Sequence, residues 1–412
     1  MVIGFDDAPC FLQLLGKLHR GPASGIDQEL LCNWDRVAFH VATVVFGVSP
    51  ASAYAPGRVE LLGNHTDYNQ GVVLAAAIDR GLTAAGISRT DNLVVLTSKA
   101  ADNEIRVSLD DLQPQTEARW ANYPLGVVHQ FVRAGFEIRG FDAEVSGDLT
   151  PGVGLSSSAA IEIATAGLLM KLHELRIDPM EVAKLCQRAE SEFAGVRSGL
   201  LDQVASVFGR CNHAVYLDCQ TEEVRTIPFP VEFALVIAES GVRHNLLESL
   251  YNERRDECAA AAAALGLESL REVTPEHLTY ARGSLEPMLF RRTAHIVGEN
   301  DRVWRAITAL QDADAPSLGQ LMNASHESSR VNFENSTPEL DQLVAIARSL
   351  PGVLGSRLSG GGFGGSTVTL VGAIHAAEVA ETIAREYREQ SEHPGSAFVC
   401  RIADGAAVSW HR

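Results

Sequence analysis

The segment that most constrains how this chain can fold is rich in glycine and serine and reads Gly147-Asp-Leu-Thr-Pro-Gly-Val-Gly-Leu-Ser-Ser-Ser-Ala-Ala160. Residues 141–145 before it alternate as in a β-strand, and residues 156–175 are rich in Ala, Ile and Leu, as in a helix. Glycines let a backbone approach a ligand closely, and a helix beginning at the serines presents free N–H groups and a positive dipole end. The segment is either a phosphate-binding loop or a plain serine-capped turn, and it lacks the Gly-Lys-Ser/Thr of a Walker A loop.

The rest of the chain mixes both kinds of element. Strand-like runs predict strands at 58–62, 71–78, 93–96 and 233–239, and two more within 354–371. Helical spacing predicts short helices within 1–40, helices at 179–193 and 199–208, long helices up to 348, and a last helix at 376–389. The length of 412 residues fits two or three domains, and no repeat or obvious linker separates them.

Charge and cysteine content exclude several classes of protein. A net charge of −18 repels phosphate backbones and anionic lipid, so neither nucleic acid nor a membrane is expected as a partner. An anionic ligand would need a local positive device such as a helix N-terminus, a metal ion or one Arg. The seven cysteines are scattered without a C-x-x-C pair, which predicts free thiols rather than disulfides or zinc. No apolar run is long enough to span a bilayer, and we expect a soluble, cytoplasmic protein.

Two further segments carry unusual chemistry. Residues 55–71 deliver Arg58 from a strand into a turn of short hydrogen-bonding side chains, which suits hydroxyl recognition but is also typical of a polar turn. The segment Ser359-Gly-Gly-Gly-Phe-Gly-Gly-Ser366 formally contains Gly-x-Gly-x-x-Gly. Because the apolar, β-branched residues 367–371 predict a strand where a dinucleotide site needs a helix, we reject a Rossmann site and predict a strand-to-strand loop.

Two carboxylates stand out near the glycine- and serine-rich segment. Glu190 lies on the helix that follows it, and Asp202 is flanked by apolar residues within 198–205. An acid in an apolar stretch is either a buried base or metal ligand, or a solvated or helix-capping residue, and local sequence leaves both open.

Taken together, the spaced motifs resemble one family. The segments Pro56-Gly-Arg-Val-Glu-Leu-Leu-Gly-Asn-His-Thr-Asp-Tyr-Asn69, 151–159 and 359–366 resemble, in order and spacing, the galactokinase branch of the GHMP small-molecule kinases. Residues 190–209 and Ser249-Leu-Tyr-Asn-Glu-Arg-Arg255 are similar to two more family segments. The resemblance, from about residue 45 onward, implies a two-domain α+β fold with mixed sheets, helices and an active-site cleft between the domains. The implied organisation is an N-terminal helical extension at 1–40 and GHMP kinase domains at 41–220 and 221–412.

The resemblance also implies roles for individual residues. Asp202 would accept the proton of the sugar C1 hydroxyl, and Arg58 would neutralise charge on the transferring phosphoryl group and keep Asp202 charged. Mg²⁺ would be held by Ser158 and Glu190, and Ser98 would lie near the nucleotide. The residues wrapping the ATP phosphates would be Gly152, Val153, Gly154, Leu155, Ser156, Ser157 and Ser158. The sugar side would comprise Asn64, His65, Thr66, Asp67 and Tyr251.

The implied reaction is transfer of the γ-phosphoryl of ATP to the anomeric hydroxyl of galactose, giving α-galactose 1-phosphate and ADP. Phosphoryl transfer depends on alignment and positive charge more than on covalent chemistry, which suits this set of residues. Alternatives are a galactose and ATP sensor without catalysis and an N-acetylgalactosamine kinase. Members of the family are usually monomers, and the resemblance therefore implies a monomer.

One departure from the family pattern bears on specificity. The family usually has Asn after Arg-Val and Glu before His-Thr-Asp, whereas this chain has Glu60 and Asn64, as though exchanged. The family's Glu lies near the sugar C6 hydroxyl, and an amide there could donate to a C6 acid that a carboxylate would repel. Galacturonate is therefore the alternative substrate, and galactose with Glu60 supplying the contact is the simpler reading.

Overall fold

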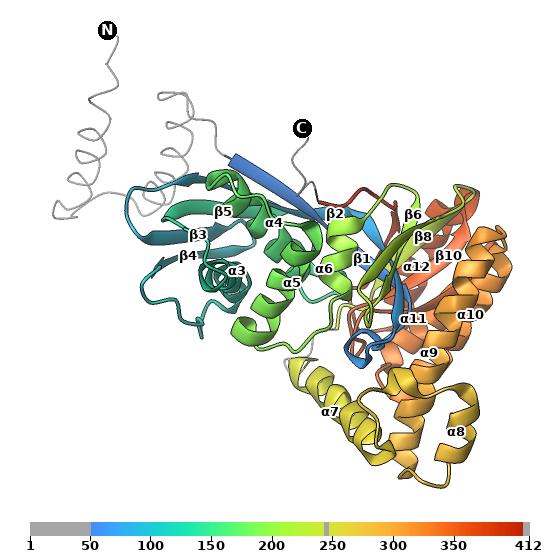
Figure 1. The fold of residues 1–412 in the computed structure, drawn as a ribbon. Helices are drawn as coiled ribbons and strands as arrows, with labels where there is room; N and C mark the ends of the chain where they lie inside the picture. Colours follow the sequence, from blue (N-terminus) through green and yellow to red (C-terminus); the bar gives the residue numbers. More distant parts are fainter. Residues whose placement is uncertain (1–50, 243–246, 407–412) are drawn as a thin grey trace. The chain divides into compact units, whose positions relative to one another are not determined.

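The computed structural model describes residues 51–242 and 247–406 of the 412 in the chain (Figure 1). The predicted extension at 1–40 and the beginning of the first predicted domain lie outside the described residues. From residue 51 onward the chain forms one unit built around two sheets. Within the described ranges, no helix combines the length and apolar character that crossing a bilayer requires.

The larger sheet has seven strands in the order β4-β3-β5-β2-β6-β7, with β1 also paired to β2. Its strands are β1 (Ala51–Leu62), β2 (Val72–Ser88), β3 (Leu93–Ser98), β4 (Ala101–Ser108), β5 (Phe141–Gly147), β6 (His213–Asp218) and β7 (Glu223–Pro228). The central strand β2 pairs with β6 through residues 72–75 and with β5 through residues 82–88. Residues 72–78 of β2 are all buried, as their unbroken apolar run predicts for a strand covered on both faces.

Four helices pack on this sheet around one apolar core. They are α3 (Asn122–Arg133), α4 (Ser157–Leu172), α5 (Pro179–Arg188) and α6 (Leu201–Phe208). Helix α4 packs against β1 and β2, and every residue from 159 to 170 is buried (Figure 1). A helix that is apolar on all sides has no solvated face, so its N-terminus is held firmly at the edge of the core.

The second sheet has four antiparallel strands in the order β11-β8-β10-β9. They are β8 (Phe233–Glu239), β9 (Val353–Ser359), β10 (Ser366–Gly372) and β11 (Ser396–Cys400). The remaining helices are α7 (Leu247–Leu265), α8 (Pro275–Ala281), α9 (Pro287–Gln311), α10 (Ala315–Ser328), α11 (Pro338–Ser349) and α12 (Ala376–Gln390). A shared core joins residues of β1, β2 and β6 to residues of α9, α10, β8 and β10.

Most predicted elements are confirmed, and the differences have local reasons. The predicted strand at 233–239 and the loop between β9 and β10 are present, and antiparallel pairing of β9 with β10 agrees with rejecting a Rossmann site. The helix predicted over 179–193 ends at residue 188 and continues as a π-helical turn, Ala189–Ala194 (η4). The sequence patterns do not predict β4, β6, β7, β11 or α3. The π-turn matters for function, because it carries Glu190.

Candidate active site

A cavity of about 670 Å³ brings together the segments singled out in the sequence. That volume suits a cofactor- or drug-sized ligand. Thirteen of the predicted site residues line it: Arg58, Asn64, His65, Asp67, Ser98, Gly152, Gly154, Ser156, Ser157, Ser158, Glu190, Asp202 and Tyr251. They come from β1, the loop after β1, β3, the loop before α4, η4, α6, α7 and α4 itself.

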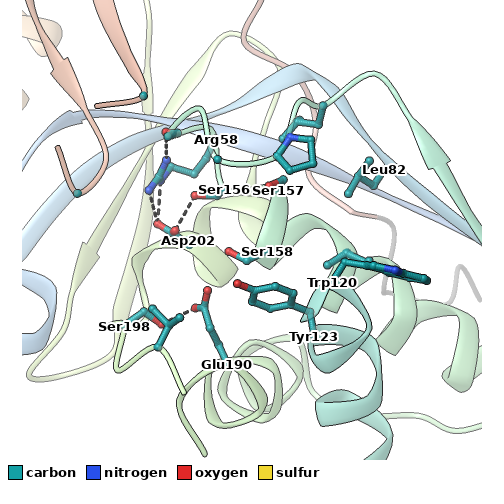
Figure 2. A pocket seen from close by; sticks show the side chains of 18 of the residues that line it. Arg58, Leu82, Trp120, Tyr123, Ser156, Ser157, Ser158, Glu190, Ser198 and Asp202 are labelled. Atoms are coloured by element: carbon teal, nitrogen blue, oxygen red, sulfur yellow. Dashed lines mark hydrogen bonds and ion pairs between the residues drawn. The ribbon is translucent and has the colours of Figure 1, made fainter. Parts of the chain in front are cut away.

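Arg58 and Asp202 form the most strongly connected pair in the cavity (Figure 2). Nε and Nη2 of Arg58 lie 2.8 and 2.7 Å from Oδ1 of Asp202, and Nη1 donates to the carbonyl of Gly154 at 2.8 Å. The Asp202 side chain keeps 20% of its surface exposed, whereas that of Arg58 keeps 6%. A carboxylate accepts about four hydrogen bonds, so Asp202 retains accepting capacity toward the cavity.

The glycine- and serine-rich loop is shaped to reach Asp202. Ser156 adopts the left-handed conformation (φ 56°, ψ 50°), and its hydroxyl donates to Oδ2 of Asp202 at 2.6 Å. Gly154 has φ 77°, and a Cβ there would lie 2.8 Å from the carbonyl of Ser359, so only glycine fits between the two glycine-rich loops. Ser157 and Ser158 open helix α4 with partly exposed side chains on the cavity wall (Figure 2).

A buried acidic network supports Glu190. Ser198 and Gln203 both donate to Oε2 of Glu190, the latter at 3.0 Å, and Gln203 also donates to Glu162 at 2.9 Å. Burial, followed by the charge of Asp202, raises the pKa of Glu190 above its usual value. A cation at this position would therefore relieve an unfavourable concentration of negative charge.

The loop after β1 packs His65 among aromatic rings. Burial lowers the pKa of His65 to about 4, so the imidazole is neutral at physiological pH. Its Nε2–H donates to the carbonyl of Gly361 at 3.0 Å, and Nδ1 accepts from the Tyr68 hydroxyl at 2.7 Å. The imidazole ring centroid lies 4.9 Å from that of Tyr251 and 4.6 Å from that of Phe333. His65 thus joins the loop after β1, α7 and the loop between β9 and β10.

Asp67 is a half-buried carboxylate facing the same cavity. Burial, reinforced by the charge of Asp202, raises its pKa to about 7. Its Oδ1 accepts the backbone N–H of Tyr68 at 2.9 Å, and a Cβ at Gly199 would lie 2.2 Å from its Oδ2. Gly199 therefore has no side chain because Asp67 occupies the space, which fixes the carboxylate relative to α6.

The amide of Asn64 is fully used inside the protein. Asn64 has no exposed surface, and its Nδ2 donates to Glu60 Oε1 at 3.0 Å and to the carbonyl of Gly360 at 2.7 Å. Its Oδ1 accepts from Nδ2 of Asn335 at 2.9 Å. The hypothesis that this amide donates to a C6 acid is therefore not supported, because neither N–H is available.

Three residues predicted for the site, Thr66, Val153 and Leu155, do not line the cavity. The Thr66 hydroxyl lies 2.7 Å from the carbonyls of Gly63 and Val72, so it holds the turn together instead of facing a sugar. The side chains of Val153 and Leu155 are buried in the core shared by the two sheets. In this loop only backbone groups of Val153 and Leu155 remain for a ligand, and the carbonyl of Leu155 accepts the backbone N–H of Arg58 at 3.1 Å.

Several cavity residues had no sequence signal. Trp120, on the 3-10 turn Arg119–Ala121 before α3, and Tyr123, in the first turn of α3, line one side of the cavity together with Leu82 (Figure 2). Aromatic and apolar side chains at a cavity wall suit a flat heterocycle. No motif surrounds them in the sequence, and α3 was not predicted, so only the folded chain identifies this wall.

Comparison with known proteins places the chain in a family. The GHMP kinases N-terminal domain matches residues 122–210, the galactokinase galactose-binding signature matches residues 43–87, and the GHMP kinases C-terminal domain matches residues 306–389. A galactokinase from Roseiflexus sp. is 40% identical over 366 residues, covering 87% of this chain and 93% of that protein. The Homo sapiens galactokinase is 43% identical over 375 residues, covering 88% and 93%.

Solved structures agree with this placement. Lactococcus lactis galactokinase complexed with galactose superposes with a TM-score of 0.85 at 32% identity, covering 91% of this chain and 99% of that one. Methanococcus jannaschii mevalonate kinase shares the fold at a TM-score of 0.62 and 19% identity. The predicted α+β GHMP kinase fold is confirmed, and the chain belongs to the galactokinase family.

Proposed function

We propose that this chain is an ATP-dependent sugar 1-kinase that transfers the γ-phosphoryl group of ATP to the anomeric hydroxyl of galactose. The observation that carries the proposal is the Arg58–Asp202 pair, which lies in one cavity with the glycine- and serine-rich loop and the polar loop after β1. The first loop suits phosphates and the second suits hydroxyls. The products are α-galactose 1-phosphate and ADP.

Asp202 acts as the general base in this proposal. Oδ1 is held by Arg58 and Oδ2 by Ser156, so the carboxylate cannot rotate away from the cavity. The C1 hydroxyl gives its proton to Asp202 as its oxygen bonds to the γ-phosphorus, and the bond between that phosphorus and the β,γ-bridging oxygen breaks with its electron pair leaving on ADP. Arg58 brings positive charge to the position where charge develops on the transferring group.

The phosphates of ATP are assigned to the loop at 152–158 and the N-terminus of α4. The free N–H groups of that helix end, together with Arg58, form a local positive site in a chain of net charge −18. The adenosine part is assigned to the wall that contains Ser98, Leu82 and Trp120, because these residues line the same cavity beyond the loop.

Mg²⁺ is assigned to Ser158 and Glu190. These residues would supply one hydroxyl and one carboxylate to the ion, with phosphate oxygens and water as its other ligands. The buried charge around Glu190 fits a cation at this place. When bound, Mg²⁺ neutralises charge on the phosphates.

Galactose is favoured over a C6 acid by the charges at the sugar end. Asp67, Glu60 and Asp202 place three carboxylates around the cavity, and the amide of Asn64 already donates both of its N–H groups within the protein. A uronate would add like charge in a poorly solvated space.

The proposal includes three further expectations. We assign the GHMP kinase domains to 41–220 and 221–412 and expect a monomer. We also expect the protein to reside in the cytoplasm, since the five cysteines within the described residues are free thiols, as in a reducing compartment.

An ADP-release assay tests the proposed function. Mg-ATP is supplied with galactose, galacturonate, N-acetylgalactosamine, glucose or mevalonate, and turnover is expected with galactose. Turnover with galacturonate alone would overturn the assignment of substrate. Tight binding of galactose and ATP without ADP release would instead indicate a sensor.

A further inference from the structure

Glu60 is a buried carboxylate with an unused oxygen at the cavity. Glu60 as a whole keeps only 3% of its surface exposed, yet it lines the cavity. Oε1 accepts from Asn64 Nδ2 at 3.0 Å and from Arg357 Nη2 at 2.9 Å. Among the residues that the structure describes, none donates a hydrogen bond to Oε2. Because Glu60 lines the cavity, this oxygen is free to accept a hydrogen bond from a ligand bound there.

The rest of Glu60 is held rigidly. Its backbone N–H donates to the Ser359 hydroxyl at 3.1 Å, and its carbonyl accepts from Nη1 of Arg357 at 3.2 Å. Arg357 has no exposed surface and pairs with this carboxylate from β9, 297 residues along the chain. A side chain fixed at this many points is pre-organised to accept a hydrogen bond in one direction.

The position of Glu60 relative to Arg58 suggests which part of a sugar it meets. The two residues are two positions apart on β1, so their side chains project from the same face of the strand, about 7 Å apart. Arg58 holds Asp202, the base assigned to the anomeric hydroxyl. A carboxylate displaced by about 7 Å along the strand faces the end of a hexose ring that is remote from C1.

We propose that Oε2 of Glu60 accepts a hydrogen bond from the sugar hydroxyl at C4 or C6, and that Glu60 is a specificity-determining residue for galactose. Asn64 and Arg357 are positioning residues that hold Oε1 and leave Oε2 for the substrate. This inference rests on the proposed function and adds the residue that selects a neutral, hydroxylated end of the sugar.

The test combines Glu60→Gln with deoxy sugars. Wild type and variant are compared with galactose and its 2-, 4- and 6-deoxy analogues, by kcat and KM in the ADP-release assay and by Kd from calorimetry. The variant keeps a carbonyl acceptor for Asn64 and Arg357 but loses the charge. The matched control is Glu104→Gln, an exposed strand residue paired with Arg106.

We expect kcat/KM for galactose to fall about 10- to 100-fold in Glu60→Gln, mostly through KM, as for the loss of a charged hydrogen bond. With either the 4-deoxy or the 6-deoxy analogue, wild type and variant should bind and react equally well, because the partner hydroxyl is absent. An equal loss with every analogue, or a loss that vanishes only with the 2-deoxy sugar, would overturn the proposal.

Two further arms keep the test decisive. If Glu60→Gln does not fold, Glu60→Asp is used instead, because its shorter side chain moves the carboxylate away from the sugar and keeps the charge. The loss in kcat/KM should again disappear with either the 4-deoxy or the 6-deoxy analogue. If wild type binds galactose without ADP release, the kinase assignment fails while the Kd comparison still tests Glu60. Absence of galactose binding to wild type would overturn both.

Discussion

Two nitrogens of Arg58 converge on a single oxygen of Asp202, at 2.8 and 2.7 Å, and join residues that lie 144 positions apart in the chain. This arrangement leaves Oδ2 of Asp202 to the Ser156 hydroxyl. One strand, one loop and one helix therefore meet at the carboxylate to which we assign the base. Geometry of this kind depends on a planar guanidinium.

Arg58→Lys should lower kcat by about 100-fold or more, because an ammonium group cannot reproduce the fork that holds Asp202 and the carbonyl of Gly154. The KM for galactose should change much less. Steady-state kinetics with varied galactose and ATP check this, with Arg106→Lys on the exposed side of β4 as the matched control. A variant with near-normal kcat would show that any positive charge suffices at this position.

Asp67 should make sugar binding depend on pH. Because its pKa in the ligand-free protein is about 7, part of the population carries a neutral Asp67 at pH 6. Ionised Asp67 is the better acceptor for sugar hydroxyls, so kcat/KM for galactose should rise with pH between 6 and 8. His65, with a pKa of about 4, does not titrate in this range. In Asp67→Asn, kcat/KM should fall by about 10- to 100-fold and this limb of the pH profile should flatten. An unchanged limb would remove Asp67 as its source.

The same carboxylate should cost stability in the absence of sugar. Its pKa is raised from 3.8 when unfolded to about 7 when folded, so the folded state binds more protons between these values. The contribution of Asp67 to stability therefore falls as pH rises from 4 to 7. Asp67→Asn should raise the thermal midpoint more at pH 8 than at pH 5, as measured by calorimetry without ligands. A gain that does not depend on pH would contradict the assigned shift.

Glu190→Gln should raise the Mg²⁺ concentration required for half-maximal activity by about tenfold or more, because it removes the one carboxylate assigned to the metal ion. The side chain of Glu192 on the same π-helical turn is exposed and paired with Arg133, which makes Glu192→Gln the matched control. Titration of Mg²⁺ at fixed ATP measures the effect. Equal Mg²⁺ dependence in both variants would argue that Glu190 does not contact the metal ion.

Asn64→Glu should lower both the free energy of unfolding and the activity with galactose. If the Asn64 amide instead faced the sugar C6 hydroxyl, the same substitution should raise the activity with galactose. A carboxylate at this buried position would face Oε1 of Glu60 and the carbonyl of Gly360, and it would donate to neither. A glutamine at this position has the length of glutamate but no charge, so Asn64→Gln should lower the free energy of unfolding less than Asn64→Glu does. The difference between the two variants measures the charge repulsion, which we expect to be about 2–4 kcal/mol. Urea unfolding of both variants, and of Asn64→Glu combined with Glu60→Gln, checks this. The combined variant should recover part of the loss, and its failure to do so would contradict the repulsion.

Local patterns in the sequence predicted the parts of the site that lie within one motif. The start of α4 at the serines and the turn after β1 follow from residues close in the chain, and thirteen of the predicted site residues line the cavity. The resemblance to galactokinases supplied their roles.

Contacts between distant segments could not be predicted in this way. The sequence around Glu60 does not indicate that Arg357 is buried beside it, and the sequence around Trp120 and Tyr123 does not indicate a cavity wall. The resemblance implies a sugar contact for Thr66, but a hydroxyl in a polar turn has the same local pattern whether it faces a ligand or, as here, backbone carbonyls. Tertiary packing decides between these outcomes.

The most direct test of the account is the Asp202→Asn variant, compared with wild type in single-turnover formation of galactose 1-phosphate from Mg-ATP. Because the amide cannot take the proton of the C1 hydroxyl, the rate of the chemical step should fall by about 100- to 10,000-fold while galactose and ATP still bind, as followed by calorimetry. A chemical step within a few-fold of wild type, with both ligands bound, would contradict the assignment of Asp202 as the base.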